Sequence, residues 1–381
     1  MEQIQMFDLI PDGERFKPKK STDWKWKFSD YPKEKNGLKV FSCFACGGGS
    51  TMGYKLAGCE VLGCCEIDEK MNEIYKLNHN PKHNFMMDIR DFNNLEDIPE
   101  ELFNLDILDG SPPCTTFSTA GEREKNWGKM KKFREGQKEQ TLDDLSFVFI
   151  ETVNKLKPKT VIMENVEGLL LGEAFEYVRK IYTQFDEVGY RVHHWLLKGE
   201  NMGVPQTRHR VFFVAIRKDL NINPYYLNMT FNYEPIPYKV IKSKDGDEFS
   251  DAAKAGKLYN MFMQAKPTDK TLADVDLRNG GKGSYFQMYI IHDEDVMPTI
   301  RASRSYSNYR WEDKKKTTME DVIHGQTFPE DYNFGVKTPD NVAYVCGMSV
   351  PPIMIKRIVE RLIEEGVYKY KEEQNGKESD T

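Results

Sequence analysis

The first half of the chain alternates apolar runs of strand length with amphipathic stretches of helix length. Short apolar runs bounded by Gly, Pro, Asn or Asp are typical of buried strands, and periodicity near 3.6 residues is typical of surface helices. The predicted strands are 38–44, 60–67, 84–89, a short run from 106, 160–166, 191–197 and 211–216, and the helices between them end near 57, 78, 103, 156 and 188. This alternation predicts an α/β fold with a mostly parallel, doubly wound, Rossmann-like sheet.

After residue 217 the chain loses this periodicity and becomes richer in Asn, Asp, Lys, Tyr and Gly. We expect a second, smaller, irregular β-rich domain there, followed by a helix from 353 to about 364. The predicted division is an N-terminal extension over 1–36, a main domain over 37–217, the small domain over 218–334, and a C-terminal segment over 335–381 that returns to the main domain and ends in a polar tail.

The most informative stretch ends on Cys114, after Asp106-Ile-Leu-Asp-Gly-Ser-Pro-Pro. Two prolines fix φ and cannot donate to a sheet, so the strand must stop and Cys114 must follow on a rigid loop at its carboxyl end. Taken alone, such a cysteine is more often a buried, inert residue. Glu164 lies in the last residues, Met163-Glu-Asn-Val166, of the next predicted strand, which brings both side chains to one edge of the sheet. A thiol beside a carboxyl indicates covalent catalysis with an acid partner.

The turn Cys46-Gly-Gly-Gly49 follows the first strand and opens a helix, where glycines allow a ligand to approach free backbone amides. Glu66 closes the second strand about 20 residues later, where an acid can accept both hydroxyls of a ribose. Asp88 is placed to bind an adenine amino group between Ile67 and Ile89, although capping of the next helix explains Asp88 equally well. This order predicts a cofactor that contains adenosine.

Gln206, Arg208 and Arg210 alternate directly before the apolar strand 211–216. At strand spacing they share one face, which suits a carbonyl, carboxylate or phosphate ligand. Ordinary surface charge is the alternative, and the buried strand that follows disfavours it.

Charge and cysteine usage narrow the class of protein. A formal net charge of -6 does not by itself point to a nucleic-acid partner. Residues 121–140, however, hold seven Lys and Arg against four Glu, and residues 298–316 hold six against two acids. Solvated loops explain these stretches about as well as a polyanionic partner does.

Seven cysteines without framework spacing indicate a reducing compartment. Cys43, Cys46, Cys64 and Cys65 are interpreted as core residues and not as a zinc site, so no metal is expected. No apolar run approaches the roughly 18 residues that span a membrane, and residues 1–8 lack the pattern of a secretory leader. We therefore expect a cytoplasmic protein with no membrane partner.

Together these motifs resemble the C5-cytosine DNA methyltransferases of bacterial or phage type, including those of restriction-modification systems. The matching segments, in the order of that family, are Phe44-Ala-Cys-Gly-Gly-Gly49, Glu66, Asp88, Gly110-Ser-Pro-Pro-Cys-Thr-Thr-Phe-Ser118, Glu164-Asn-Val166, Gln206-Thr-Arg-His-Arg210, Pro298-Thr-Ile-Arg301, Gly325-Gln-Thr-Phe-Pro329 and Gly347-Met-Ser-Val-Pro-Pro352. They span residues 38 to about 364.

The resemblance implies that Cys114 attacks C6 of a cytosine flipped out of double-stranded DNA, and that C5 then takes a methyl group from S-adenosylmethionine. Glu164 would hold a proton at N3, and Arg210, with Arg208, would steady O2 and the nearby backbone. The implied cofactor residues are Phe44, Ala45, Cys46, Gly47, Gly49, Glu66, Ile67, Asp88, Ile89, Pro113 and Ser349. The loop 118–140 would close over the flipped base, residues 218–297 would contain the target-recognition region, with Arg278 as a candidate groove contact, and the enzyme would act as a monomer on DNA.

Two residues depart from the family pattern: Cys46 replaces the usual first glycine of the cofactor turn, and Met348 replaces the usual asparagine. Cysteine suits this turn unless φ is positive there. Three alternatives remain open at this stage: an RNA (tRNA) cytosine-5 methyltransferase with the same motifs, a catalytically silent DNA-binding relative, and a dinucleotide-dependent oxidoreductase supported only by the glycine turn and Glu66.

Overall fold

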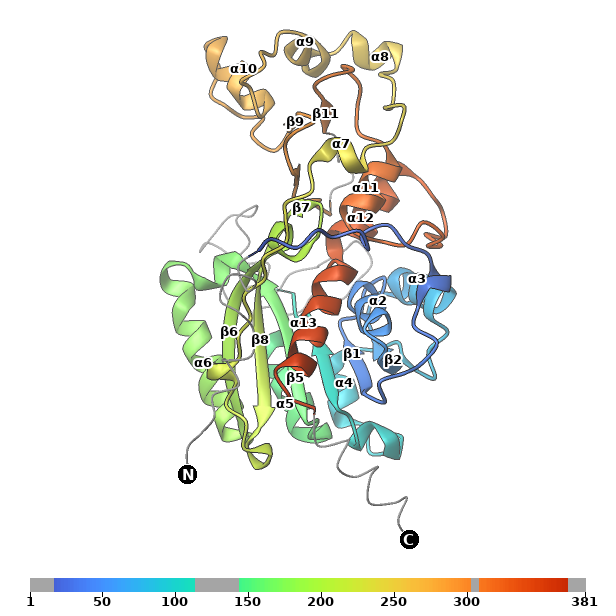
Figure 1. Cartoon of the computed structure of the whole chain (residues 1–381), viewed down its shortest axis with the longest axis vertical. Coiled ribbons are helices and arrows are strands. Elements are labelled where there is room, and N and C mark those ends of the chain that lie inside the picture. The colour runs from blue at the N-terminus through green and yellow to red at the C-terminus, as the bar shows by residue number, and fades with distance from the viewer. Residues whose placement is uncertain (1–16, 114–143, 303–307, 369–381) are drawn as a thin grey trace.

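The centre of the molecule is a seven-stranded sheet in the order β3-β2-β1-β4-β5-β8-β6 (Figure 1). The computed structural model describes residues 17–113, 144–302 and 308–368. The strands are β1 (Lys39–Cys43), β2 (Glu60–Cys65), β3 (His83–Phe85), β4 (Ile107–Gly110), β5 (Thr160–Val166), β6 (Tyr190–Lys198) and β8 (His209–Arg217). The first five are parallel, and β8 runs antiparallel between β5 and β6. The predicted mostly parallel sheet is confirmed.

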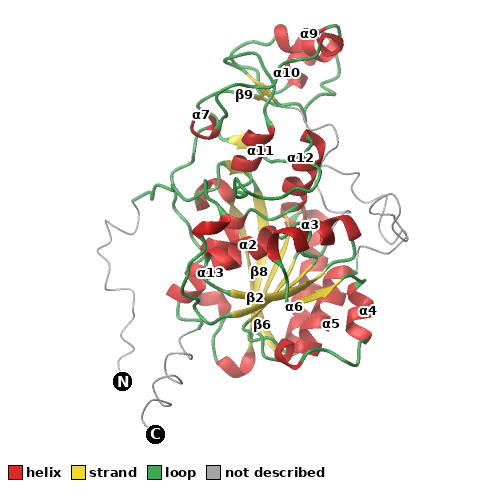
Figure 2. Cartoon of the chain, turned by 90° about the vertical axis from the view of Figure 1, so that its right-hand side faces the viewer, coloured by secondary structure: helices red, strands yellow, loops and turns green. Residues whose placement is uncertain are grey.

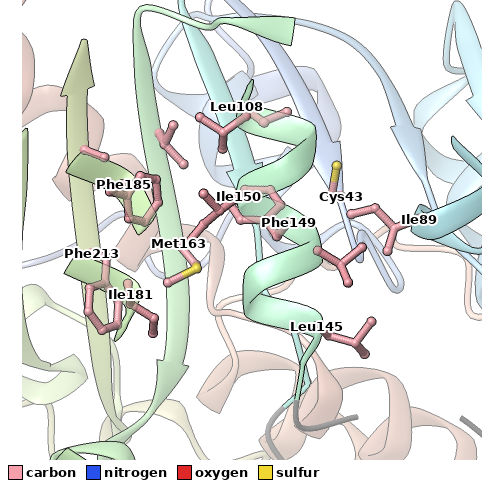
Figure 3. Close-up of a cluster of buried hydrophobic side chains, with 14 of the residues drawn as sticks. Cys43, Ile89, Leu108, Leu145, Phe149, Ile150, Met163, Ile181, Phe185 and Phe213 are labelled. Carbon is pink, nitrogen blue, oxygen red and sulfur yellow. The ribbon is translucent and has the colours of Figure 1, made fainter. Parts of the chain in front are cut away.

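Helices cover both faces of this sheet (Figure 2). One face packs against α4 (Ile89–Asn94), α5 (Leu145–Leu156) and α6 (Phe175–Glu187), and the other packs against α2 (Gly49–Leu56) and α13 (Pro352–Glu364). Figure 3 shows the first core, in which Phe149 of α5, Met163 of β5 and Phe213 of β8 belong to one buried cluster. Strands buried on both faces have continuous apolar sequences, which is why the sequence predicts their positions.

Two predicted elements near residue 90 are corrected. The strand expected over 84–89 ends at Phe85, and Asp88 caps the amino end of α4 through the backbone amide of Arg90. The helix expected over 91–103 is divided into α4 and a 3-10 turn at Glu100–Phe103. Pro99 lies between the two pieces, and proline inside a helix removes a hydrogen bond and clashes with the preceding turn.

The small domain contains short helices joined by loops (top of Figure 1). The helices are α7 (Tyr238–Ile241), α8 (Asp251–Lys254), α9 (Lys257–Met263) and α10 (Leu272–Arg278), and the described strands β9 (Ile290–Ile291), β10 (Met297–Pro298) and β11 (Tyr309–Arg310) have two residues each. The expectation of β-rich structure is therefore corrected. Phe249, Phe262, Leu272, Ile290 and Tyr309 belong to the separate core of this domain. A core of this size holds only short helices and strands. These are too short to show a periodic pattern of apolar residues in the sequence.

A third cluster joins the small domain to the sheet. It unites α3 (Glu69–His79), α11 (Met319–Gly325) and α12 (Pro339–Met348) with the N-terminal segment, which crosses the molecule between the sheet and the small domain. Trp26 is 5% exposed in this cluster, and its indole Nε1 donates to the carbonyl of Thr327 at 2.8 Å. Trp26 thus anchors the N-terminal segment in the folded core.

Replacement of Trp26 by phenylalanine should lower the free energy of unfolding by about 2 kcal/mol. The ring volume is largely kept, but the Thr327 carbonyl loses its donor in a buried setting. Urea unfolding measures this change. Trp24→Phe is the matched control, because Trp24 is less buried and its ring packs edge-on against His324. Equal losses in the two variants would contradict the importance of the hydrogen bond.

One helical stretch in the described residues, Pro339–Glu364, is long and apolar enough to cross a membrane. It comprises α12 and α13, which meet at the turn Ser349–Pro351. In its most apolar window, 78% is buried inside the protein. Packing on α2 and the sheet therefore accounts for its apolar character.

Candidate active site

The carboxyl ends of β4 and β5 lie side by side, as predicted. Asp109 pairs with Ile162 and Gly110 with Met163, and the side-chain amide of Asn165 reaches the carbonyl of Pro112 at 3.5 Å. Pro113 is the last described residue before the gap, so Cys114 itself lies outside the described residues. The rigid corner that precedes Cys114 is therefore held against the strand that carries Glu164.

Glu164 and Arg210 form an ion pair, with Arg210 Nε donating to Glu164 Oε1 at 2.8 Å. In the antiparallel register Val166 faces Arg210, so Glu164 and Arg210 are diagonal neighbours on one face of the sheet. Both side chains are largely sheltered from solvent. The pair offers a carboxyl that can hold a proton and a guanidinium that can donate to a carbonyl oxygen.

Arg208 lies deeper and contacts backbone. Its guanidinium donates to the carbonyls of Ile300 at 3.2 Å and Gly347 at 3.1 Å. Burial, together with the charge of Arg210, lowers the pKa of Arg208 to about 9, which still leaves it charged at neutral pH. Within the described residues its Nε has no hydrogen-bond partner. Arg208 therefore joins the end of the small domain to the end of α12.

Gln206 is fully buried and its side-chain amide is engaged on both sides. Its nitrogen donates to Gly325 and Gln326, and its oxygen accepts from the backbone amide of Ile300. It belongs to β7 (Gln206–Thr207), which pairs with β10 outside the main sheet. Of the three alternating side chains, Arg210 therefore contacts Glu164, and the other two hold the domain junction.

The predicted glycine turn lies at the carboxyl end of β1. Gly48 is the N-cap of α2 at φ +85°, where a side chain would be strained and would also meet His79. The carbonyl of Gly47 accepts from the Tyr332 hydroxyl at 2.6 Å and contacts His79 Nε2 at 3.3 Å. Burial lowers the pKa of His79 to about 3, so the imidazole is neutral at this contact. The turn is therefore held in place by His79 of α3 and by Tyr332, which lies in the segment after α11.

Cys46 adopts φ +48°, in the left-handed region that favours glycine. The family's usual glycine fits this backbone without strain, whereas Cys46 does not. Glu66 compensates by accepting the Cys46 amide on Oε2 at 2.7 Å and the Asp68 amide on Oε1 at 2.8 Å. Both carboxylate oxygens of Glu66 are thus used to hold the backbone of the turn.

The remaining predicted cofactor residues differ in how much of each side chain is exposed and in what it contacts. Ile67 is 39% exposed, whereas Ile89 is 4% exposed and belongs to the core of Figure 3. Asp88 caps α4 and pairs with Arg90 at 3.4 Å, so the capping alternative is observed. The hydroxyl of the buried Ser349 donates to the Val345 carbonyl. Phe44 and Pro113 are partly exposed, and Ala45, Gly47 and Gly49 are buried.

Sequence reasoning assigned no role to Asn165 or Asp109. Asn165 lay inside a quoted motif, and its 2% exposure and its contact with Pro112 show that it holds the Cys114 corner. Asp109 interrupts the apolar run Ile107-Leu-Asp-Gly110, and this interruption was the available signal. Its carboxylate accepts from Ser42 at 2.5 Å and Tyr54 at 3.0 Å.

Arg278 forms a two-point ion pair with Asp269, with both contacts at 2.8 Å. This carboxylate holds the pKa of Arg278 above its usual value, and Arg278 in turn lowers the pKa of Asp269. Its charge is thus already compensated within the small domain. Lys282 and Phe286, later in the same domain, are exposed.

Met348 is partly buried at the end of α12, next to Gly347, which accepts from Arg208. Met348→Asn should change the affinity for S-adenosylmethionine or for DNA by about threefold to tenfold while activity survives, because it returns a polar group to this junction. Calorimetry with each ligand measures the change, and Met319→Asn, on α11, is the control. Unchanged affinity for both ligands would contradict this role.

Comparison with known proteins identifies the family. Residues 38–364 match the family described as C-5 cytosine-specific DNA methylase. The chain is 36% identical over 238 residues to the Type II methyltransferase M.FnuDI of Fusobacterium nucleatum, covering 62% of this chain and 60% of that protein. It is 26% identical over 350 residues to the Type II methyltransferase M.NgoPII of Neisseria gonorrhoeae, covering 84% and 94%.

Solved structures agree on the fold. That of Spodoptera frugiperda DNMT2 superposes with a TM-score of 0.60 at 17% identity, covering 86% of this chain and 100% of that one. Dnmt2 of S. pombe gives 0.55 at 16% identity, covering 86% and 99%. The sheet has the Rossmann-like topology of these methyltransferase structures. The chain belongs to the C-5 cytosine-specific DNA methylase family.

Proposed function

We propose that this protein transfers a methyl group from S-adenosylmethionine to C5 of a cytosine in double-stranded DNA. The observation that carries the proposal is the Glu164–Arg210 pair at 2.8 Å, on the strand next to the Pro112–Pro113 corner. A cytosine presents N3 beside O2. A carboxyl that holds a proton next to a guanidinium that donates matches these two atoms.

Each residue has a distinct task in this reaction. The thiolate of Cys114 forms a bond to C6, and the electron pair moves toward C5 while Glu164 holds a proton at N3. Arg210 donates to O2, and Arg208 keeps the backbone at Ile300 and Gly347 in place. After methyl transfer a water molecule takes the C5 proton, the electron pair left at C5 restores the C5–C6 double bond, and the bond between sulfur and C6 breaks, which restores the thiolate.

The residues at the glycine turn fit S-adenosylmethionine, which supplies the methyl group as an electrophile when bound. Glu66 holds the turn through two backbone amides, and its carboxylate is the group proposed to meet the ribose hydroxyls. Ile67 has the exposed surface that one face of an adenine needs, and little of Ile89 is exposed. Asp88 caps the start of α4 and Ser349 follows the end of α12, and both are proposed to contribute chiefly by fixing the backbone there.

DNA is the proposed macromolecular partner, bound by a single copy of the chain in the cytoplasm. The family that residues 38–364 match is described as a DNA methylase, and this supports DNA over RNA as the substrate. Target bases must leave the duplex before C6 can be attacked. The basic residues of 118–140, outside the described range, are proposed to contact phosphates, so binding should weaken as salt rises.

Transfer of tritium from methyl-labelled S-adenosylmethionine to random-sequence duplex DNA tests this function. We expect incorporation by the native protein and none by Cys114→Ser. Bisulfite sequencing of the product then gives the target site. Label in tRNA but not in DNA would show that the substrate is RNA. Absence of label in both would indicate a catalytically silent DNA-binding protein.

A further inference from the structure

The N-terminal segment reaches the residues that support the cofactor turn, although it precedes the part of the chain that matches the family. That match covers residues 38–364, whereas Phe28 lies in a 3-10 turn at Phe28–Asp30. Figure 1 shows the segment crossing the molecule as far as α3. The ring of Phe28 is partly buried there and packs on the cluster that joins α3, α11 and α12.

The cofactor turn is held at the carbonyl of Gly47. The hydroxyl of Tyr332 donates to this carbonyl at 2.6 Å, and Nε2 of His79 contacts it at 3.3 Å. Both side chains are buried, and they lie close to the backbone of the turn. A Cβ on Gly47 would lie 2.8 Å from the Tyr332 hydroxyl, and one on Gly48 would collide with His79. A displacement of either ring would therefore move the turn.

Phe28 contacts both of these supporting rings. It packs edge-on against His79, with 6.3 Å between ring centroids and 87° between planes. It also packs against Tyr332, with 6.4 Å between centroids and 41° between planes. Aromatic pairs at such separations attract each other beyond the burial of their surface. Phe28 is therefore a contact that the two supports of the Gly47 carbonyl share.

The backbone of the same segment holds the stretch that carries Tyr332. The amide of Phe28 donates to the carboxylate of Asp331, at 3.1 Å to Oδ1. The amide of Glu330 donates to the carbonyl of Trp26 at 2.9 Å. Because Glu330 and Asp331 directly precede Tyr332, the N-terminal segment fixes both the ring of Tyr332 and the backbone that leads to it.

We propose that Phe28 is a positioning residue that fixes His79 and Tyr332, and through them the cofactor turn, for S-adenosylmethionine. A turn that is already fixed loses less conformational freedom when a ligand binds, so the ligand binds more tightly. For its effect on the cofactor this inference rests on the proposed function. It extends the cofactor site to a residue outside the matched region.

Two measurements on Phe28→Ala test the inference. By calorimetry, the Kd for S-adenosylmethionine should rise about threefold to thirtyfold, the range for residues that act on a site through others. The KM for the cofactor should rise with it, while kcat at saturating cofactor and the Kd for duplex DNA stay unchanged. In the protein without ligands, hydrogen exchange of the backbone amides over 47–52 should become faster. The exchange over Thr160–Val166 should not change.

Tyr332→Phe tests whether Phe28 acts through Tyr332. This variant loses the hydroxyl that holds Gly47, so its Kd for S-adenosylmethionine should also rise. Adding Phe28→Ala to Tyr332→Phe should raise the Kd by less than the product of the two single effects, because both changes release the same carbonyl. Effects that multiply would contradict action through Tyr332.

Trp24→Ala is the matched control, because Trp24 belongs to the same segment and cluster but its ring faces His324. It should leave the Kd for S-adenosylmethionine unchanged. Should Phe28→Ala not fold, Asp331→Ala removes the acceptor of the Phe28 amide at an exposed position and should raise this Kd about twofold or more.

A native Kd for S-adenosylmethionine in Phe28→Ala, or an equal rise in Trp24→Ala, would overturn the inference. A native protein that binds no S-adenosylmethionine would instead refute the proposed function. In that case the exchange of the amides over 47–52 would still decide whether Phe28 fixes the turn.

Discussion

Replacement of Glu164 by glutamine is expected to lower kcat for DNA methylation by about 10²- to 10⁴-fold, the usual range for loss of a positioned general acid. Glutamine keeps the shape of the side chain and can still accept from Arg210 through its amide oxygen. It cannot hold an acidic proton at N3, so the charge that develops as Cys114 adds to C6 is not relieved. Single-turnover methyl transfer under saturating DNA and cofactor measures the chemical step.

Glu167→Gln is the control for this experiment. Glu167 is three residues further along the chain, is more exposed, and faces His209 at 3.6 Å. We expect its kcat to remain within about twofold of the native value, as for other exposed ion pairs. If the Glu164→Gln enzyme had the native kcat, Glu164 would have no part in the reaction. Its ion pair with Arg210 would then be a structural feature.

Asp109→Asn is expected to stabilise the fold at neutral and alkaline pH by roughly 2 to 4 kcal/mol. The pKa of Asp109 is raised from 3.8 to about 7 by burial, so the native state resists the ionisation that the unfolded chain undergoes freely. This group therefore contributes stability below about pH 4 and loses that contribution as pH rises to about 7. The gain from asparagine should be near zero at pH 4, grow up to pH 7 and then level off.

Urea unfolding at several pH values measures this gain. Asp106→Asn should behave in the opposite way at neutral pH, because Asp106 accepts from Lys159 at 3.0 Å and from the backbone amide of Lys39, and both interactions favour its ionised form. Destabilisation by Asp109→Asn at pH 8 would show that its hydrogen bonds to Ser42 and Tyr54 outweigh the burial of charge.

The main domain could be predicted from sequence because its strands are buried on both faces. Thr160–Val166 was predicted at its observed limits, and the alternation of strands with helices predicted the parallel sheet to which β1, β2 and β4 belong. The edge that unites the Cys114 corner with Glu164 followed from the direction of parallel strands alone. In this domain the local pattern of apolar residues agrees with the global fold, so the predicted sheet matches the observed one.

Other features depend on contacts that no local pattern contains. Alternation placed Arg208 beside Arg210, but Arg208 faces carbonyls from Ile300 and Gly347, segments distant in sequence. Asp88 was predicted at the end of a strand, yet its carboxylate caps a helix. The positive φ of Cys46 is likewise set by the tertiary fold, which holds the turn against Glu66 and Tyr332.

Covalent capture of DNA tests the central claim most directly. The protein is incubated with S-adenosylmethionine and duplex DNA that contains 5-fluorocytosine, and the product is digested and analysed by mass spectrometry. Because fluorine at C5 cannot leave as a proton, the bond between sulfur and C6 should persist after methyl transfer. We predict a methylated adduct on the peptide that contains Cys114, and none with Cys114→Ser. An adduct on another cysteine, or none in a protein that methylates normal DNA, would contradict the assignment of Cys114 as the nucleophile.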